Sequence, residues 1–218
     1  PVAGELAPVL PAPPWPLAPG PVLARRDDFD LGALEPCWIS VRDRPERHCT
    51  TTELAGWLTL RARGGMDDPD VVFVGRRQQH LSCRARALID PAEGRGGLAV
   101  RLDERHHYEI EAVDGEVTVL ARIGPLRTVV ASQPVPAGPV VLGVQVTVTP
   151  IPHDRHVGPD TVAFGVEASD GTFTELGALD GRYLSTEVAG GFTGRVIGMY
   201  AAAGTVHFDW FDYELLDR

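Results

Sequence analysis

Short runs in which apolar and polar residues alternate follow one another along most of the chain after residue 26. The clearest run covers residues 80–90, where Ser82, Arg84 and Arg86 take alternate positions and apolar side chains fill those between. This period of two predicts a β-strand with one face in solvent. Comparable runs, alternating or rich in β-branched and aromatic residues, cover residues 38–41, 56–65, 71–79, 96–103, 107–113, 116–123, 140–151, 160–177, 195–202 and 205–215.

Turn signals separate these runs. The Asp-Gly pairs at Asp114-Gly115 and Asp170-Gly171 predict two β-hairpins. Residues 184–194 alternate poorly and contain three glycines, so they predict a loop, with one helical turn at most in residues 185–190. Because no run with a helical period is long enough to compete, the pattern predicts an all-β fold, a two-sheet antiparallel sandwich of the jelly-roll type.

Residues 1–25 differ from the rest because they are rich in proline and carry no alternating run. Such a segment favours extended polyproline conformation and cannot form a core. We interpret it as an interdomain linker, which predicts another domain upstream, and residues 26–218 as one globular domain. The alternative is that the segment is a proline-rich ligand for an aromatic groove on a partner protein.

Composition narrows the function classes. The formal net charge of −10 would repel phosphate backbones and the arginines are scattered, which argues against a nucleic-acid partner. The sequence contains no run of 18 apolar residues, so it predicts no membrane-spanning helix. The three cysteines form no CxxC pair, so a metal–thiolate site is disfavoured and at most one disulfide could form. All 20 basic residues are arginine, which we interpret as a compositional bias.

Four stretches carry a resemblance to a known family: residues 73–80 (FVGRRQQH), 103–111 (DERHHYEIE), 180–201 (DGRYLSTEVAGGFTGRVIGMYA) and 208–214 (FDWFDYE). In this order and spacing they resemble the C-terminal, concanavalin A-like β-sandwich of glycoside hydrolase family 43 enzymes, mainly β-xylosidases and α-arabinofuranosidases. The match extends from about Arg26 to Tyr213. The resemblance implies that the parent protein is a glycosidase and that the proline-rich start follows its catalytic domain.

In that family, a five-bladed propeller carries the catalytic aspartate base, acidic modulator and glutamate acid. Inverting hydrolysis needs two carboxyl groups about 6.5–9.5 Å apart, and we assign no such pair in this chain. The resemblance therefore implies an accessory domain without hydrolytic activity of its own. Its expected partners are an N-terminal catalytic propeller in the same polypeptide and an oligosaccharide substrate.

The resemblance also implies a role for Phe192. In the β-xylosidase branch of the family, a loop at this position sends an aromatic side chain to the rim of the active-site pocket. An aromatic face packs on sugar C–H groups and excludes water, and the flanking glycines would let the backbone expose it. The alternative is that Phe192 plugs the edge of the sandwich.

Further residues are candidates for the interface with the propeller. Arg76, Arg77 and Gln79 belong to a polar run at the end of a predicted strand, where one alternating pair must face inward or toward a neighbouring domain. His107 is adjacent to His106, so the two side chains point to opposite faces and cannot chelate one ion together. We expect interface roles for His107 and for Arg195.

Aspartates near the two chain ends could hold a structural Ca²⁺ ion. The predicted terminal strands pair, which would bring Asp27, Asp28 and Asp30 near Asp209 and Asp212, and oxygen ligands suit calcium. Asp28 and Asp209 are the expected ligands, and solvated carboxylates are the alternative. No other cofactor is expected.

The tryptophans Trp38, Trp57 and Trp210 are most simply core anchors, although an exposed tryptophan platform would indicate sugar binding.

The leading hypothesis is a non-catalytic accessory domain that packs on the propeller and completes its active-site pocket for xylo-oligosaccharides or arabinosides. The main alternative is an autonomous carbohydrate-binding module for xylan-type glycans, and a third is a laminin G-like adhesion module. For an enzyme that cleaves oligosaccharides, a cytoplasmic location is favoured over secretion, which stays open.

Overall fold

The computed structural model describes residues 26–113, 115–149 and 158–216, so the predicted linker at residues 1–25 lies outside the described residues. Within them the chain forms thirteen strands, two 3₁₀ turns and one short helix. In chain order they are β1 (Arg26–Asp27), β2 (Ile39–Ser40), η1 (Pro45–Arg47), β3 (Cys49–Thr50), β4 (Leu58–Arg61), β5 (Val72–Arg77), β6 (Cys83–Asp103), β7 (His106–Val113), β8 (Glu116–Ile123), β9 (Leu126–Pro134), β10 (Val140–Val148), β11 (Asp160–Glu167), β12 (Phe173–Asp180), η2 (Gly181–Leu184), α1 (Thr186–Ala189) and β13 (Val196–Leu215).

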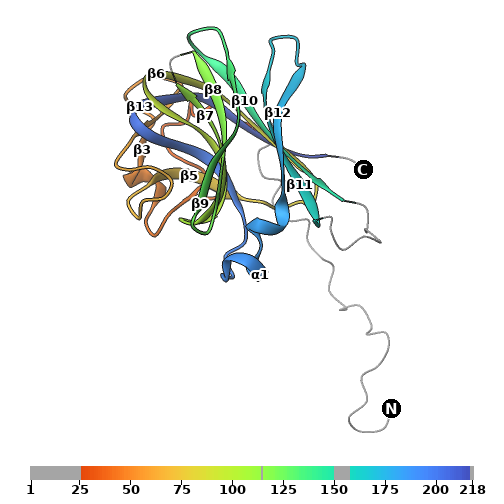
Figure 1. The fold of residues 1–218 in the computed structure, drawn as a ribbon. Coiled ribbons are helices and arrows are strands. Elements are labelled where there is room, and N and C mark those ends of the chain that lie inside the picture. The colour runs from red at the N-terminus through yellow and green to blue at the C-terminus, as the bar shows by residue number, and fades with distance from the viewer. Residues whose placement is uncertain (1–25, 114, 150–157, 217–218) are drawn as a thin grey trace, which may run out of the picture.

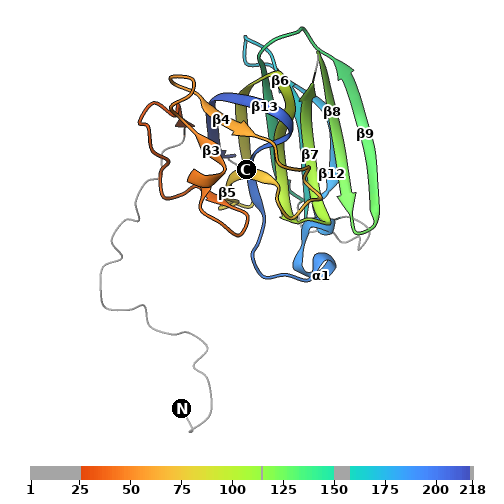
Figure 2. The same cartoon turned by 90° about the vertical axis from the view of Figure 1, so that its left-hand side faces the viewer.

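The strands build two antiparallel layers that face each other (Figures 1 and 2), which confirms the predicted concanavalin A-like sandwich. One layer has the order β12-β11-β10-β6-β13, and the other runs β9-β8-β7-β6-β13-β5-β2. The predicted hairpins are present: β7 and β8 pair Val113 with Glu116, and β11 and β12 pair Glu167 with Phe173. Among the described residues, no helix is long and apolar enough to cross a membrane.

Two long strands, β6 and β13, belong to both layers. The first part of β6 pairs with β10 and its last part pairs with β7. The first part of β13 pairs with β5, and later parts pair with β4 and β1. Between the two layers, the ladder that joins β6 to β13 changes register three times, and such bulges bend a strand and increase its twist.

The sequence had predicted two strands in place of each of these long ones, and that prediction was wrong. Residues 80–90 and 96–103 were predicted as separate strands, but Gly96 and Gly97 mark close backbone contact inside one continuous strand. A Cβ atom on Gly97 would lie 1.9 Å from the Ile110 carbonyl oxygen, and one on Gly96 would lie 2.2 Å from the Tyr200 carbonyl oxygen. Glycine is therefore required where the strands cross from one layer to the other.

The core lies between the layers and takes side chains from both. Leu98, Ile110 and Val119 come from one layer, Val144 and Phe164 come from the other, and all five are fully buried. Burying one such side chain stabilises a fold by about 1.5–3 kcal/mol. A second, smaller cluster on the opposite face of β5, β6 and β13 consists of Met66, Val71, Phe73, Ala99 and Tyr200.

Candidate functional site

A loop of residues 181–195, here called the Phe192 loop, connects β12 to β13 and projects from one end of the sandwich (Figure 1). It contains η2 and α1, and because α1 is the one short helix within residues 185–190, the prediction of at most one helical turn there is confirmed. Contacts with the sandwich anchor the first residues of this loop. The Tyr108 hydroxyl donates to the Asp180 carbonyl oxygen at 2.8 Å, the Arg182 N–H donates to the Asp180 carboxylate at 2.9 Å, and Leu184 is buried in the main core.

Arg195 holds the other end of the loop. Its guanidinium donates to both carboxylate oxygens of Asp160, at 2.5 and 3.1 Å, and to the carbonyl oxygens of Leu184 at 2.8 Å and Gly181 at 2.6 Å. Side-chain exposure is only 12% for both Arg195 and Asp160. The planar fork of arginine suits this bidentate contact. Arg195 therefore directs these donors into its own domain, and its role at a domain interface stays a prediction.

The tip of the loop stands free of the rest of the protein. Gly190 ends α1 with a φ of 76°, and Gly194 has a φ of 72°, a conformation that glycine adopts without strain. A Cβ atom added at Gly190, Gly191 or Gly194 would meet nothing within 4 Å. Phe192 lies between them with a relative exposure of 101%, so the alternative in which it plugs the sandwich edge is wrong.

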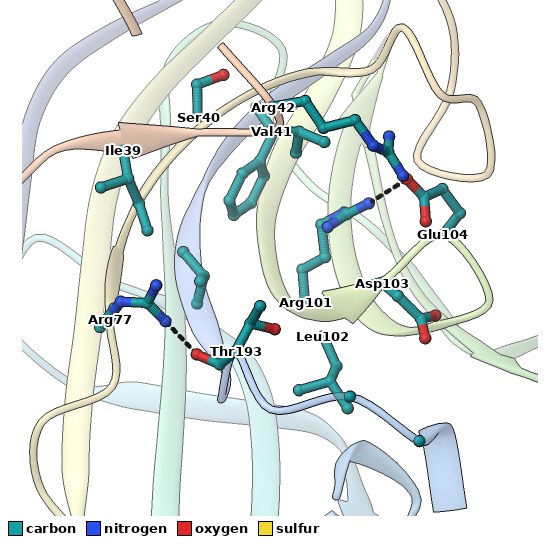
Figure 3. A pocket seen from close by; sticks show the side chains of 14 residues that line it. Ile39, Ser40, Val41, Arg42, Arg77, Arg101, Leu102, Asp103, Glu104 and Thr193 are labelled. Atoms are coloured by element: carbon teal, nitrogen blue, oxygen red, sulfur yellow. Dashed lines mark hydrogen bonds and ion pairs between the residues drawn. The ribbon is translucent and has the colours of Figure 1, made fainter. Parts of the chain in front are cut away.

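Beneath the tip lies a pocket of about 450 Å³, shown in Figure 3. Four segments line it: the β2 region from Ile39 to Arg42, β5 with Phe73 and Arg77, the end of β6 with the following Glu104, and the end of the Phe192 loop with the first residue of β13, Val196. Arg77 lines the pocket and donates from Nη1 to the Thr193 carbonyl oxygen, which fixes the loop to β5. Of the residues that line this pocket, only Arg77 was a candidate site residue, and it was assigned to a domain interface. The lining segments are far apart in sequence, and only the sheet pairing brings them together.

In the polar run at the end of β5, side chains alternate between the interior and the surface, as the sequence predicted. Arg76 is buried, and its guanidinium carbon lies 5.0 Å from the centre of the Tyr213 ring. Arg77 and Gln79 are exposed, and the backbone N–H of Gln79 donates to the Tyr213 hydroxyl at 2.9 Å. Arg77 and Gln79 thus lie on the surface of the domain, whereas Arg76 packs inside it, and their roles at a domain interface stay predictions.

His107 is fully buried within this domain, and its role at a domain interface stays a prediction. Its Nε2 lies 3.1 Å from Glu109 Oε1, and its Nδ1 lies 3.2 Å from the Asp103 carbonyl oxygen. His106 points to the other face, where its Nδ1 lies 3.0 Å from the Asp103 carboxylate. The opposite orientation of the two histidines is confirmed.

The predicted calcium ligands are engaged with other groups. Asp28 accepts from Arg26 at 2.6 Å, and Asp27 accepts from the Trp38 indole at 2.7 Å. Burial raises the pKa of Asp209, and the neighbouring Asp28 adds to this while Arg26 opposes it. In the part of the chain that the structure describes, no three acidic, histidine or cysteine side chains are grouped as a metal site requires. The calcium site stays a prediction.

The tryptophans have different environments. Trp38 is buried between Phe29 and Phe211, which confirms it as a core anchor. Trp57 and Trp210 are only partly buried, and the guanidinium carbon of Arg26 lies 4.4 Å from the centre of the Trp210 ring.

Comparison with known proteins gives three findings. A family model described as the beta xylosidase C-terminal concanavalin A-like domain matches residues 26–214. The non-reducing end alpha-L-arabinofuranosidase BoGH43B of Bacteroides ovatus is 31% identical over 211 residues, which are 88% of this chain and 37% of that protein. Among solved structures, the GH43 protein BlXynB of Bacillus licheniformis matches this chain with a TM-score of 0.80 at 21% identity. The matched part covers 94% of this chain and 42% of BlXynB.

The fold also occurs in the carbohydrate-binding module CBM66 of Bacillus subtilis, with a TM-score of 0.51 at 12% identity over 82% of this chain and 95% of the module. At the identities of BlXynB and CBM66 the likeness concerns the fold alone. This chain spans about two fifths of the length of the arabinofuranosidase and of BlXynB. The family match, by contrast, spans nearly all of the described residues. The chain therefore belongs to the beta-xylosidase C-terminal concanavalin A-like domain family.

Proposed function

We propose that this chain is the non-catalytic accessory domain of a family 43 glycosidase acting on xylo-oligosaccharides or arabinosides. It packs on a catalytic propeller in the same polypeptide and completes the active-site pocket with Phe192. The observation that carries the proposal is the state of that side chain. Phe192 is fully exposed on a loop tip whose two ends are anchored by Tyr108 and Arg195.

Exposing an aromatic side chain completely, while fixing the backbone around it, has no benefit for the isolated fold. Burial of a phenylalanine side chain contributes about 1.5–3 kcal/mol, and this contribution is left unused here. Tyr183 and Val188, on the same loop, are also partly exposed, with exposures of 39% and 45%. A neighbouring domain that covers the loop would bury all three side chains and place Phe192 against a sugar ring.

The carboxylates of this chain support a non-catalytic role. Glu109 and Glu111 share one face of β7, but both are buried. Glu109 is next to His107, and Glu111 accepts from the Tyr200 hydroxyl at 3.2 Å. Inverting hydrolysis needs a sugar and a water molecule between its two carboxyl groups, and buried groups with these partners do not admit them.

The direct test is Phe192→Ala in the protein that joins this chain to its propeller. The substitution should lower kcat/KM on the smallest substrates, with about a tenfold loss if one well-packed aromatic contact is removed from the transition state. Leu31→Ala is the control, because Leu31 is 82% exposed and lies in the β1–β2 segment away from the loop. Equal kcat/KM for Phe192→Ala and the parent protein would refute the pocket-completing role.

A second experiment separates this function from an autonomous carbohydrate-binding module. The isolated 218-residue chain should not hydrolyse aryl xylosides or arabinosides, and calorimetry should detect no binding of neutral xylo-oligosaccharides at micromolar concentrations. Micromolar binding of an unbranched xylo-oligosaccharide would favour the binding module. Turnover by the purified chain would contradict the non-catalytic role.

A further inference from the structure

The pocket under the Phe192 loop is separate from Phe192 itself, which points away from the protein and does not line it. Its walls combine two chemistries. Apolar side chains of Ile39, Val41, Phe73 and Leu102 form one part, and charged side chains form the other. Its volume of about 450 Å³ lies in the range of about 300–1,000 Å³ that is typical of small-molecule sites.

Positive charge exceeds negative charge in this pocket. Three arginines, Arg42, Arg77 and Arg101, face two carboxylates, Asp103 and Glu104. Asp103 is committed to its own turn, where it accepts from the backbone N–H of residue 105 at 2.7 Å and lies 3.0 Å from the ring of residue 106. Glu104 is thus shared by two arginines, with Arg42 at 2.5 Å and Arg101 at 3.1 Å.

Glu104 is held as an anion by its surroundings. Burial alone would raise its pKa, but a backbone hydrogen bond and the two guanidinium groups of Arg42 and Arg101 together lower it. One carboxylate is therefore the only close partner of two cations among the residues that line the pocket. A second anion would find uncompensated positive charge there.

Arg101 is one specific source of this excess positive charge. Its exposure is only 8%, and its Nε has no hydrogen-bond partner within the described part of the chain. Burial lowers the pKa of its guanidinium, Arg42 adds to this, and Glu104 and Asp103 oppose it. A buried donor without a partner is destabilising, and an acceptor brought to this guanidinium by a ligand would reduce that destabilisation. Figure 3 shows Arg101 and Arg77 on opposite sides of the pocket.

We propose that this pocket binds a sugar acid of the hexuronate class. The carboxylate of the ligand accepts from Arg101, because a guanidinium group matches a planar carboxylate. On the opposite side of the pocket, the donors of Arg77 that the Thr193 contact leaves free donate to the ring hydroxyl groups of the ligand. The pyranose ring packs on the apolar wall of Ile39, Val41 and Phe73 through its C–H groups. The site depends only on residues of this chain, and it does not require the pocket-completing role of Phe192.

The first experiment is calorimetry on the 218-residue chain with D-glucuronate, D-glucose and inorganic phosphate as separate ligands. Glucuronate should bind about tenfold more tightly than glucose, which has the same ring without the charge. It should also bind more tightly than phosphate, which has no ring to cover the apolar wall. Equal affinity for glucuronate and glucose would overturn the role of the arginines, and equal affinity for phosphate would overturn the sugar specificity.

Charge-changing variants test the residues. Arg77→Gln, at an exposed side chain, should preserve the fold and weaken glucuronate binding about tenfold. Glu104→Gln should act in the opposite direction and tighten binding, because it removes the anion that competes for Arg101. Arg105→Gln is the matched control at an exposed arginine outside the pocket, and it should bind as the unaltered chain does. Weaker binding by Glu104→Gln would refute the proposed arrangement.

A final comparison identifies the source of the carboxylate. The chain is titrated with free glucuronate, with a xylo-oligosaccharide that carries one glucuronic acid branch, and with the same oligosaccharide without the branch. Tighter binding of the branched oligosaccharide than of free glucuronate would assign the site to glycan chains, and the reverse would assign it to free sugar acids. Binding of the unbranched oligosaccharide as tight as that of the branched one would overturn the proposal. Phe192→Ala should leave all these affinities unchanged, so failure here is distinguishable from failure of the pocket-completing role.

Discussion

Replacing Arg195 with methionine should destabilise the domain strongly, because one side chain anchors the Phe192 loop to the sandwich. Arg195 makes four hydrogen bonds, two to the Asp160 carboxylate and one each to the carbonyl oxygens of Gly181 and Leu184. Methionine has a similar length but no donor. The substitution would leave the Asp160 carboxylate, with 12% side-chain exposure, without its cation.

The expected cost follows from these contacts. Removing one partner of a buried ion pair costs about 3–5 kcal/mol, mainly because the remaining charge stays desolvated. Domains of this kind have a total stability of about 5–15 kcal/mol, so the loss is a large share of it. Arg195→Lys keeps the charge but not the planar fork, and it should recover only part of the difference.

Urea unfolding of the 218-residue chain measures the effect, as the free energy of unfolding extrapolated to water. Arg77→Met is the control, because Arg77 also contacts the loop, through the Thr193 carbonyl oxygen, but from an exposed position. That change should cost about 0.5–1.5 kcal/mol or less. If Arg195→Met costs no more than Arg77→Met, Arg195 does not anchor the loop and the account of the site fails.

Two further predictions concern the sandwich itself. Gly97→Ala should destabilise the domain by about 1–3 kcal/mol or more in urea unfolding, because the new Cβ atom would lie 1.9 Å from the Ile110 carbonyl oxygen. The control is Gly191→Ala, which has open space around it and should change the free energy of unfolding by less than about 0.5 kcal/mol. Burial raises the pKa of Glu111 above its ordinary value of 4.5, so its protonated form stabilises the fold at low pH, and this contribution is lost as the pH rises through the folded-state pKa. Glu111→Gln should therefore be more stable relative to the unaltered chain at pH 7 than at pH 4, and a difference that does not change with pH would contradict the assignment.

Much of the fold follows from local pattern. The alternation in residues 80–90 and the Asp170-Gly171 pair each predict an element that the structure contains, because the signal lies within a few residues. The continuity of β6 and β13 could not be predicted in this way. The gap between the runs 80–90 and 96–103 looks like a strand boundary until the close contact of Gly97 with Ile110 across the sheet is known.

The same distinction applies to the site. The exposure of Phe192 was predicted from its glycine-rich surroundings and is confirmed. The partner of Arg195 could not be predicted because Asp160 lies 35 residues away in sequence, and the burial of His107 could not be predicted because only the fold encloses it. A buried charge is recognised by its partner, and the partner is a property of the tertiary structure.

The central claim is that Phe192 faces a catalytic domain, and hydroxyl-radical footprinting of the joined protein tests it most directly. The rate of Phe192 oxidation is measured in the isolated 218-residue chain and in the protein that joins it to its propeller, with exposed Leu31 as the internal control. The account predicts strong protection of Phe192 in the joined protein, greater still when substrate is bound, and equal oxidation of Leu31 in both. Equal oxidation of Phe192 in the two proteins would contradict it.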